Sequence, residues 1–284
     1  MRIEIQPGFS LNVHLRHRGD DNRAPLVLLH GFTGSSEGWG LFGELLAESH
    51  SLLLVDIVGH GASDAPADLE HYRMANAADD VVAAVAKAGF DHANWLGYSM
   101  GGRLALAIAT QHPRSMERLI LIGASPGIER EDERAARVKA DELLASQLER
   151  DGIRPFVDYW ESIPLFDTQR SLPAEVRAAI RAGRLKNTEV GLANSLRGMG
   201  AGAQAPLHHR LATLGVPALL LAGEADAKYA AIAASMASAM PCARAAVIPH
   251  AGHAAHLEQP ARTAQEVLAF LATPLHHTSR GVNS

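Results

Sequence analysis

The pentapeptide Gly97-Tyr98-Ser99-Met100-Gly101 decides the fold. It follows an apolar run, Asn94-Trp95-Leu96, and precedes a helix-like stretch from Gly101 to Gln111. In a G-x-S-x-G pattern between a strand and a helix, the glycines relieve crowding in a tight turn that presents the serine hydroxyl. The pentapeptide alone is a weak signal, but this context makes it a strong one. We expect Ser99 to be the chemically active residue at the end of a strand.

Short runs of leucine and β-branched residues recur along the chain, each followed by a helix-like stretch. The runs are Leu26–Leu29, Leu52–Val55, Asn94–Leu96, Leu119–Ile122, Ala218–Leu221 and Ala245–Ile248. Runs that are apolar on both faces are typical of parallel strands covered by helices on each side. We therefore predict an α/β fold with a mostly parallel central sheet flanked by helices. Ile3–Ile5 and Leu11–His17 are expected to add an antiparallel hairpin at its edge.

The alternation breaks between Pro126 and about Ala205, a stretch richer in charged residues than the rest. We predict an inserted helical lid at 126–205, a core formed by 1–125 and 206–274, and a disordered tail at 275–284. Pro164 and Pro173 punctuate the insertion. Its expected helices are about Asp132–Arg150, Ile153–Glu161, Pro173–Lys186 and Thr188–Met199.

Length and composition limit the function classes. The 284 residues suit one large α/β unit with an insertion, and the net charge of -5 argues against generic nucleic-acid binding. Cys242 is the only cysteine, so no internal disulfide can form, and we expect it to be buried. The first residues lack the apolar stretch of a signal peptide, and no run is long enough to span a bilayer. These features predict a cytoplasmic protein without membrane anchoring.

A serine hydroxyl needs an imidazole partner, and that imidazole needs an orienting carboxylate. The chain order serine, acid, histidine directs attention to two later strand ends. Asp226 follows the run that ends at Leu221, and His253 follows the run that ends at Ile248. Ligands bind at such carboxyl ends in open α/β sheets. We predict a catalytic triad of Ser99, Asp226 and His253.

Alternatives exist for two of these residues. Glu224 is the rival acid, and His250 and His256 are the rival histidines, with a hydrogen-bonded structural role as their plainer interpretation. The spacing His250-x-x-His253-x-x-His256 also fits a metal site, but Gly252 and the preceding strand end indicate a loop rather than one helical face. We predict neither a metal nor a cofactor.

Two backbone amides are expected to form an oxyanion hole. His30-Gly31-Phe32 follows the strand Leu26–Leu29, where folds of this kind supply the second amide. The predicted donors are the N–H groups of Phe32 and Met100. The turn Asp56–Ser63 is assigned structural work.

Three arginines are candidates for binding an anion. On the helix from Asp132, Arg137 shares a face with Ala140, Leu144 and Leu148. On the helix from Pro173, Arg184 aligns with Val176, Ile180 and Gly183, and Arg103 lies one helical turn after Ser99. The alternative is that these side chains snorkel or form surface pairs such as Glu133 with Arg137. If they face Ser99, they suit a polyanionic substrate, because guanidinium groups bind carboxylates in bidentate fashion.

Longer motifs make a resemblance specific. They are Gly97-Tyr98-Ser99-Met100-Gly101-Gly102-Arg103, Ser125-Pro126-Gly127-Ile128, Glu133-Arg134-Ala135-Ala136-Arg137, Trp160, Pro164-Leu165-Phe166, Ser195-Leu196-Arg197-Gly198-Met199-Gly200, Gly223-Glu224-Ala225-Asp226-Ala227-Lys228 and Ile248-Pro249-His250-Ala251-Gly252-His253. From about Leu26 to Phe270 the chain resembles the 2-succinyl-6-hydroxy-2,4-cyclohexadiene-1-carboxylate synthases of the α/β-hydrolase superfamily.

The resemblance implies a lyase of menaquinone biosynthesis that uses the triad for proton abstraction and eliminates pyruvate. Its small-molecule substrate carries three carboxylates, which would give Arg103, Arg137 and Arg184 a purpose. It also implies Tyr98 and Trp160 as pocket contacts and Lys228 as a further anion contact. Their plainer interpretations are packing and a solvated charge. Glu129 stands where some family members have glutamine, and the alignment leaves open whether Tyr159 or Trp160 faces the ligand.

Two rival functions remain from the residues alone. A carboxylic ester or thioester hydrolase needs the same triad and oxyanion hole, working through an acyl-enzyme, but no cluster of inward arginines. A binding or scaffold protein on the same fold would not need the intact triad. The sequence predicts no oligomeric state.

Overall fold

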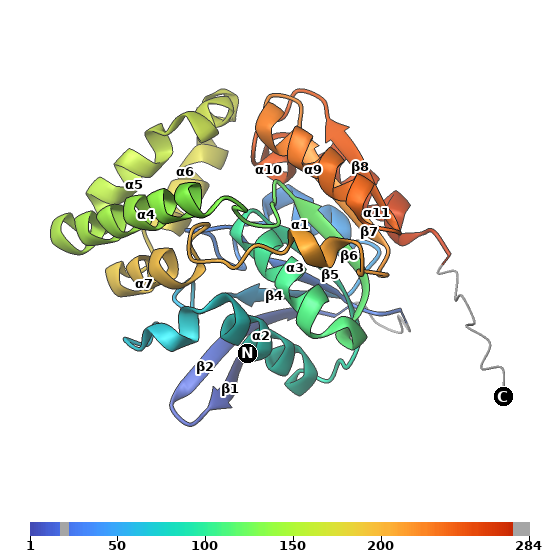
Figure 1. The fold of residues 1–284 in the computed structure, drawn as a ribbon, viewed down its shortest axis with the longest axis horizontal. Coiled ribbons are helices and arrows are strands. Elements are labelled where there is room, and N and C mark those ends of the chain that lie inside the picture. The colour runs from blue at the N-terminus through green and yellow to red at the C-terminus, as the bar shows by residue number, and fades with distance from the viewer. Residues whose placement is uncertain (18–22, 275–284) are drawn as a thin grey trace.

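The sheet at the centre of the molecule runs through most of the chain. The computed structural model describes residues 1–17 and 23–274, so the predicted tail lies outside the described residues. Within these ranges the sheet has eight strands, in the order β1-β2-β4-β3-β5-β6-β7-β8 (Figure 1). The strands are β1 Arg2–Gln6, β2 Phe9–Arg16, β3 Leu26–Leu29, β4 Leu52–Asp56, β5 Ala93–Tyr98, β6 Met116–Ile122, β7 Ala218–Gly223 and β8 Ala243–Ile248.

Pairing in the sheet confirms the expected mixture of directions. Strands β4, β3, β5, β6, β7 and β8 pair in parallel, whereas β1 with β2 and β2 with β4 pair antiparallel. The amino-terminal hairpin is therefore the antiparallel edge that its sequence predicts. Because β3, β5, β7 and β8 are parallel, the loops that follow them gather at one edge of the sheet.

Helices cover both faces of the sheet. They are α1 Gly40–Ala47, α2 Met74–Lys87, α3 Met100–Gln111, α4 Glu131–Asp151, α5 Ile153–Ser162, α6 Ala174–Arg184, α7 Glu189–Met199, α8 His208–Leu211, α9 Ala227–Ala239, α10 Ala255–Glu258 and α11 Pro260–Leu271, with 3₁₀ segments at Leu69–Tyr72, Pro113–Ser115 and Pro164–Ser171. One apolar cluster joins α2, α3 and α9 to the sheet, and a second joins α1 and α11 to its other face. Of the described helices, none is long and apolar enough to cross a membrane.

Strand β8 corrects one expectation. The prediction of runs apolar on both faces holds for β3, β4 and β7, all of whose residues are buried. It is wrong for β8, where Val247 is 52% exposed, because β8 is the last strand of the sheet and lacks a neighbour on one side. Cys242, expected to be buried, precedes this edge strand and is exposed.

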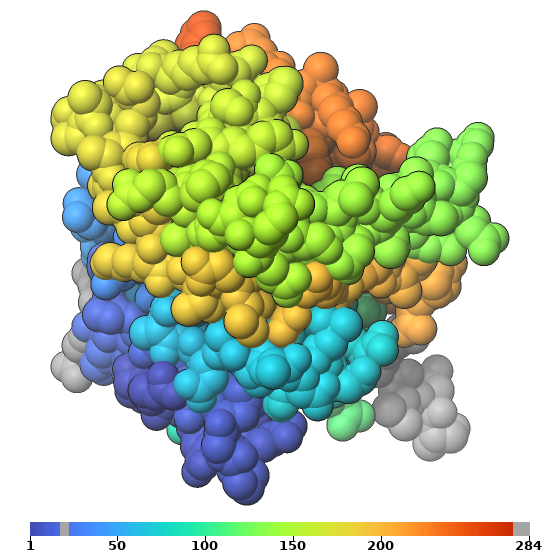
Figure 2. All heavy atoms as spheres, turned by 90° about the vertical axis from the view of Figure 1, so that its left-hand side faces the viewer, coloured from blue at the N-terminus to red at the C-terminus, as the bar shows by residue number. Residues whose placement is uncertain are grey.

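The insertion between β6 and β7 is helical, as predicted, and α4, α5, α6 and α7 differ from their expected bounds by at most two residues. The insertion has an apolar cluster of its own, which includes Ala145, Leu148, Phe156 and Leu192. In Figure 2 these helices, green to yellow, form the upper and middle part of the face turned to the viewer, above the blue and cyan amino-terminal segments. Boundaries at 126 and 205 remain a prediction.

Buried histidines make stability depend on acidity. Burial lowers the pKa of His30, His60 and His256, the last two to about 3. In the unfolded chain these rings take up a proton near pH 6.5, so acidification favours the unfolded state. The associated stability is present above about pH 6.5 and is lost as pH falls toward 3.

We therefore expect the free energy of unfolding, measured by urea denaturation, to decline between pH 7 and pH 4.5. His256→Phe, which keeps a ring against Tyr98, should reduce that slope by up to about 1.4 kcal/mol per pH unit. The matched control is His209→Phe at an exposed histidine, which should leave the slope unchanged. Equal slopes in all three proteins would contradict the assignment.

Two glycines provide a test of packing around the β5–α3 turn. A Cβ on Gly101 would lie 2.1 Å from the carbonyl oxygen of Leu29, whereas a Cβ on Gly183 in α6 would meet nothing within 4 Å. Gly101→Ala should cost more than about 2 kcal/mol because backbone must move. Gly183→Ala should stabilise by up to about 1 kcal/mol through helix propensity. Urea midpoints measure both, and a Gly101→Ala protein as stable as wild type would refute the packing argument.

Candidate active site

The turn between β5 and α3 holds Ser99 in a left-handed backbone conformation, with φ at 50°. For a residue other than glycine this costs about 1–3 kcal/mol, so the surroundings must impose it. The Ser99 N–H donates to the Ile122 carbonyl at 2.9 Å, and the Ser99 carbonyl accepts from the Arg103 N–H at 3.0 Å. A Cβ on Gly97 would lie 2.2 Å from the Gly101 oxygen, which explains the first glycine of the motif.

Three residues from separate loops form one hydrogen-bonded chain. His253 Nε2 lies 3.0 Å from Ser99 Oγ, and His253 Nδ1 lies 2.7 Å from Asp226 Oδ2. A carboxylate accepts, so Nδ1 carries the proton and Nε2 is left to accept from the serine hydroxyl. His253 is 2% exposed, which keeps water away from the ring. The arrangement can move a proton from Ser99 to His253 while Asp226 stabilises the imidazolium.

The rival acid and histidines stand outside this chain. Glu224 is exposed and accepts the backbone N–H of His250 at 3.0 Å, and the His250 ring is also exposed. His256 is buried against Tyr98, with ring centroids 4.4 Å apart, and its Nδ1 has no hydrogen-bond partner. The hydrogen-bonded role expected for His256 is therefore wrong at Nδ1, because aromatic rings surround it. No group of three or more histidine, cysteine or acidic side chains in the described ranges could hold a metal.

Glu258 holds the loop that carries His253. Its two carboxylate oxygens accept the backbone N–H groups of Gly252 at 2.6 Å and Ala254 at 3.2 Å. The bonds flank the histidine on both sides and fix its backbone. Glu258 was not predicted from the sequence. The one feature that could have indicated it is its place five residues after His253, at the end of the short helix α10.

The loop after β3 presents Phe32 beside the serine turn. His30 accepts the Ile57 N–H at Nε2 (3.1 Å) and lies 2.8 Å from the Gly31 oxygen through Nδ1, so the loop is fixed from both nitrogens. Neither the Phe32 nor the Met100 amide has a protein acceptor among the residues described. Two unpaired amides beside Ser99 are the requirement for binding a developing oxyanion.

The predicted structural role of the turn after β4 is visible in its hydrogen bonds. Asp56 accepts from the N–H groups of Ser36 and Ala62 and from the Asn12 amide, at 2.5, 2.9 and 2.9 Å. Burial alone would raise the pKa of Asp56, but the neighbouring His30 and these hydrogen bonds together outweigh it, so the pKa lies below its usual value. The carboxylate thereby connects strand β2 with the loops that follow β3 and β4.

Arg103 and Arg137 form one group with Tyr229. Burial lowers the pKa of Arg103 to about 10; Tyr229 opposes this and the positive charge of Arg137 adds to it. Arg137 is 45% exposed and its Nε donates to the buried Asp141 at 2.8 Å. Of the predicted stripe, Leu148 is buried and Leu144 packs against the apolar cluster of the insertion, but Ala140 is exposed and the buried positions beside them are Asp141 and Ala145. Arg137 still lies one turn before Asp141.

Arg184 belongs to a second group. It is 8% exposed, its Nη1 lies 3.2 Å from Glu161, and its guanidinium carbon lies 5.1 Å from the centre of the Phe166 ring. Burial raises the pKa of Tyr98, and the charge of Arg184 opposes that rise. Phe32, Tyr98, Phe166 and Arg184 line a cavity of about 720 Å³ between α6 and the loop after β3. Arg184 thus faces inward, as its helical position predicts.

The remaining residues predicted to contact the substrate differ in whether they are packed or exposed. Trp160 packs edge-on against Phe32 at 5.2 Å between ring centroids, whereas Tyr159 is 49% exposed. The structure thereby directs Trp160, not Tyr159, toward the Phe32 side. Lys228 is exposed, with its ammonium 5.9 Å from the Tyr229 ring, and Glu129 is exposed as well.

Two aromatic residues near His253 were not predicted. The Tyr229 and Phe166 rings have centroids 4.6 and 6.3 Å from the histidine ring. Both lie inside motifs noted for the resemblance, or directly after one, but no spacing rule distinguishes them from packing residues. They make the surroundings of His253 largely aromatic.

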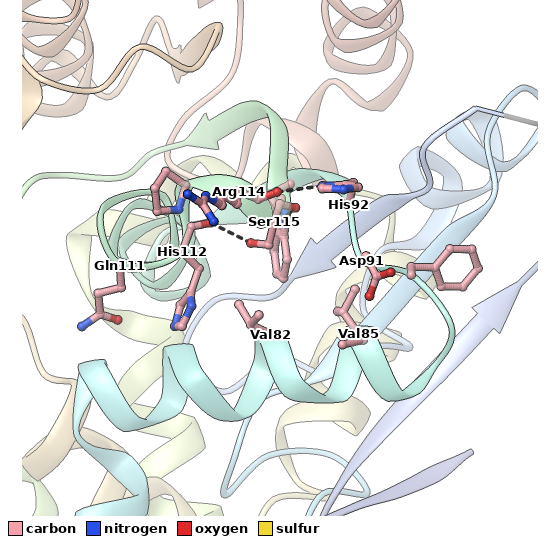
Figure 3. A pocket seen from close by; sticks show the side chains of 12 residues that line it. Val82, Val85, Asp91, His92, Gln111, His112, Arg114 and Ser115 are labelled. Atoms are coloured by element: carbon pink, nitrogen blue, oxygen red, sulfur yellow. Dashed lines mark hydrogen bonds between the residues drawn. The ribbon is translucent and has the colours of Figure 1, made fainter.

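A separate hollow of about 560 Å³ lies between α2 and the turn after α3 (Figure 3). His92 Nδ1 lies 2.7 Å from the Arg114 oxygen at its rim, and Val82 and Val85 form part of its floor. None of the predicted site residues lines it. Ser99 lies at the opposite end of β5 from this hollow.

Comparisons with known proteins agree with this geometry. The α/β-hydrolase fold model matches residues 24–260. A Citrobacter koseri 2-succinyl-6-hydroxy-2,4-cyclohexadiene-1-carboxylate synthase is 34% identical over 246 residues, covering 87% of this chain and 93% of the relative. A Bacillus subtilis protein provisionally named for the same synthase is 40% identical over 255 residues, covering 90% and 93%.

Solved structures extend the likeness to three dimensions. MenH from S. aureus superimposes with a TM-score of 0.87 at 32% identity, covering 91% of this chain and 97% of that chain. A thermophilic esterase from Thermogutta terrifontis gives 0.82 at 26% identity, covering 95% and 98%. The chain therefore belongs to the α/β-hydrolase family and, within it, to the 2-succinyl-6-hydroxy-2,4-cyclohexadiene-1-carboxylate synthases.

Proposed function

We propose that this chain eliminates pyruvate from 2-succinyl-5-enolpyruvyl-6-hydroxy-3-cyclohexene-1-carboxylate, giving 2-succinyl-6-hydroxy-2,4-cyclohexadiene-1-carboxylate. This is a carbon–oxygen lyase reaction of menaquinone biosynthesis. Relatives named for that product support it, because the match runs through nearly their whole length. The structural observation that supports it most is a serine–histidine–aspartate chain accompanied by the buried Arg184 and the partly buried Arg103.

The proposed step is a proton abstraction. Ser99 Oγ passes its proton to His253 and takes a proton from the ring carbon next to the succinyl ketone. The electron pair of that C–H bond enters the ring as the double bonds rearrange, and the bond between ring carbon and enolpyruvyl oxygen breaks. The enolate of pyruvate leaves and takes the proton from His253 at its methylene carbon, which gives pyruvate and restores the neutral imidazole. The atoms balance without an external oxidant or reductant.

The site residues have distinct proposed roles in this step. Negative charge develops on the ketone oxygen, where the Phe32 and Met100 amides would donate hydrogen bonds. Arg103, Arg137 and Arg184 would bind the three carboxylates, with Tyr98 and Trp160 as walls and Lys228 as a peripheral cation. Closing charged groups away from water strengthens each of these interactions.

The alternative is an ester or thioester hydrolase. The likeness to the Thermogutta terrifontis esterase supports this second function. An esterase would use Ser99 as an acyl-transfer nucleophile but would gain nothing from several arginines. Pyruvate release from the enolpyruvyl substrate, coupled to lactate dehydrogenase, decides between them. Brisk hydrolysis of short acyl esters with no pyruvate would remove the lyase proposal.

Ser99→Ala should abolish turnover while leaving substrate affinity and the melting temperature close to wild type. Loss of the proton-abstracting oxygen is expected to lower kcat by about 10³-fold or more. Ser238→Ala on α9, an exposed serine that bonds only within its helix at 3.0 Å, is the control and should be fully active. Unchanged pyruvate release by Ser99→Ala would refute the catalytic role.

Arg137→Ala and Arg184→Ala should each raise KM by about 10-fold or more, because a carboxylate loses its charged partner. Arg184→Ala should have the larger effect, since Arg184 is more deeply buried. Arg130→Ala at the start of α4, where the exposed Arg130 pairs with Asp132, is the matched control. Wild-type KM in both variants would remove the lid arginines from substrate binding.

We also propose that the protein acts in the cytoplasm on a small polycarboxylate and that it binds no nucleic acid. The net charge of -5 and the single unpaired cysteine support this.

A further inference from the structure

The three arginines of the site differ in how much of their charge is already matched. Arg137 donates to the buried carboxylate of Asp141 at 2.8 Å. Arg184 lies 3.2 Å from Glu161, which it shares with Arg181 at 2.7 Å. Both guanidinium groups therefore have a carboxylate partner before any substrate arrives.

Arg103 is held by a neutral group instead. Its Nη1 donates to the Gln204 Oε1 at 3.0 Å, and no carboxylate bonds to it among the described residues. Gln204 is 1% exposed, and its Nε2 is buried without a hydrogen-bond partner. An amide oxygen fixes the direction of a guanidinium without cancelling its charge.

The loop that carries Gln204 is tightly seated. It joins α7 to the core, and the Gln204 N–H donates to the Gly200 carbonyl at 3.1 Å. Glycine is required on it, because a Cβ on Gly202 would lie 2.6 Å from the Val138 nitrogen and a Cβ on Gly200 would lie 2.5 Å from Asp141 Oδ2. The same loop thus sits against the partner of Arg137 and supplies the partner of Arg103.

We propose that Gln204 is a positioning and specificity-determining residue, which orients Arg103 toward a substrate carboxylate without forming an ion pair with it. The inference rests on the proposed function and deepens it. Arg103 is the main binding group for the anion, whereas Asp141 and Glu161 weaken the attraction of Arg137 and Arg184 for a substrate carboxylate. A glutamate at 204 would fit the same space but would occupy Arg103 permanently.

The test compares Gln204→Glu with Gln204→Met by pyruvate release and by thermal melting. Gln204→Glu should raise KM by about 10-fold or more, change kcat much less, and melt no lower than wild type, because the new carboxylate pairs with Arg103. Gln204→Met keeps the charge free and loses only orientation, so its KM should rise by a smaller factor. A merely structural glutamine would give the reverse order, with the glutamate variant nearer to wild type in KM.

Two controls isolate the charge effect. Gln265→Glu makes the same change beside another arginine, since Gln265 Oε1 accepts from Arg262 Nη1 at 2.9 Å on the exposed face of α11, and its KM should equal that of wild type. In an Arg103→Met background, Gln204→Glu should lose most of its additional KM effect. A wild-type KM in Gln204→Glu, or an undiminished effect in that background, overturns the proposal.

The outcome separates this inference from the proposed function. If the wild-type protein releases no pyruvate, the lyase assignment fails, and calorimetric titration of citrate as a tricarboxylate probe then tests Gln204 alone. Weaker citrate binding by Gln204→Glu than by wild type and by Gln204→Met supports the positioning role. Equal binding by all three proteins refutes it.

Discussion

The close contact between strand β5 and helix α3 is the constraint on which the site depends. Gly97 and Gly101 let the two backbones approach until no side-chain carbon fits between them. That approach forces Ser99 into a left-handed backbone and lifts its hydroxyl to the end of the sheet. Phe32, Asp226 and His253 come from loops that start at the same edge, because the strands before them are parallel to β5. One packing requirement thus fixes where chemistry can occur.

Sequence reasoning was strongest where a local pattern has one physical solution. The G-x-S-x-G turn, the apolar runs and the helices of the insertion were predicted within a few residues, since each depends on near neighbours. The order serine, acid, histidine led to Asp226 and His253, which the fold brings into hydrogen-bond contact with Ser99. The contribution of Glu258 depends on how the chain turns after β8, which no short pattern reveals.

Errors arose where the answer depends on long-range packing. Val247 and Cys242 were expected to be buried, but whether a strand is inner or outer is decided by its partners across the sheet. On α4, the apolar residues correctly predicted that Leu144 and Leu148 pack inward, but Ala140 is exposed and the buried position beside it is an acid, Asp141. Periodicity counts hydrophobic residues and does not register a carboxylate that is buried to hold an arginine. Gln204 was not predicted for the same reason, because it is a polar residue 101 positions from its partner, Arg103.

The place of β8 at the rim of the sheet has a consequence for how the site comes apart. Ser99 follows an interior strand, whereas His253 follows a strand that is paired on one side only. Its loop is held by the carboxylates of Glu258 and Glu224 and by the Ala225 N–H, which donates to the Ala251 carbonyl. If local opening begins at an edge strand, we expect it on the histidine side, with serine and the inner strands still folded. We therefore expect heat to remove activity through the outer strand before it unfolds the interior of the sheet.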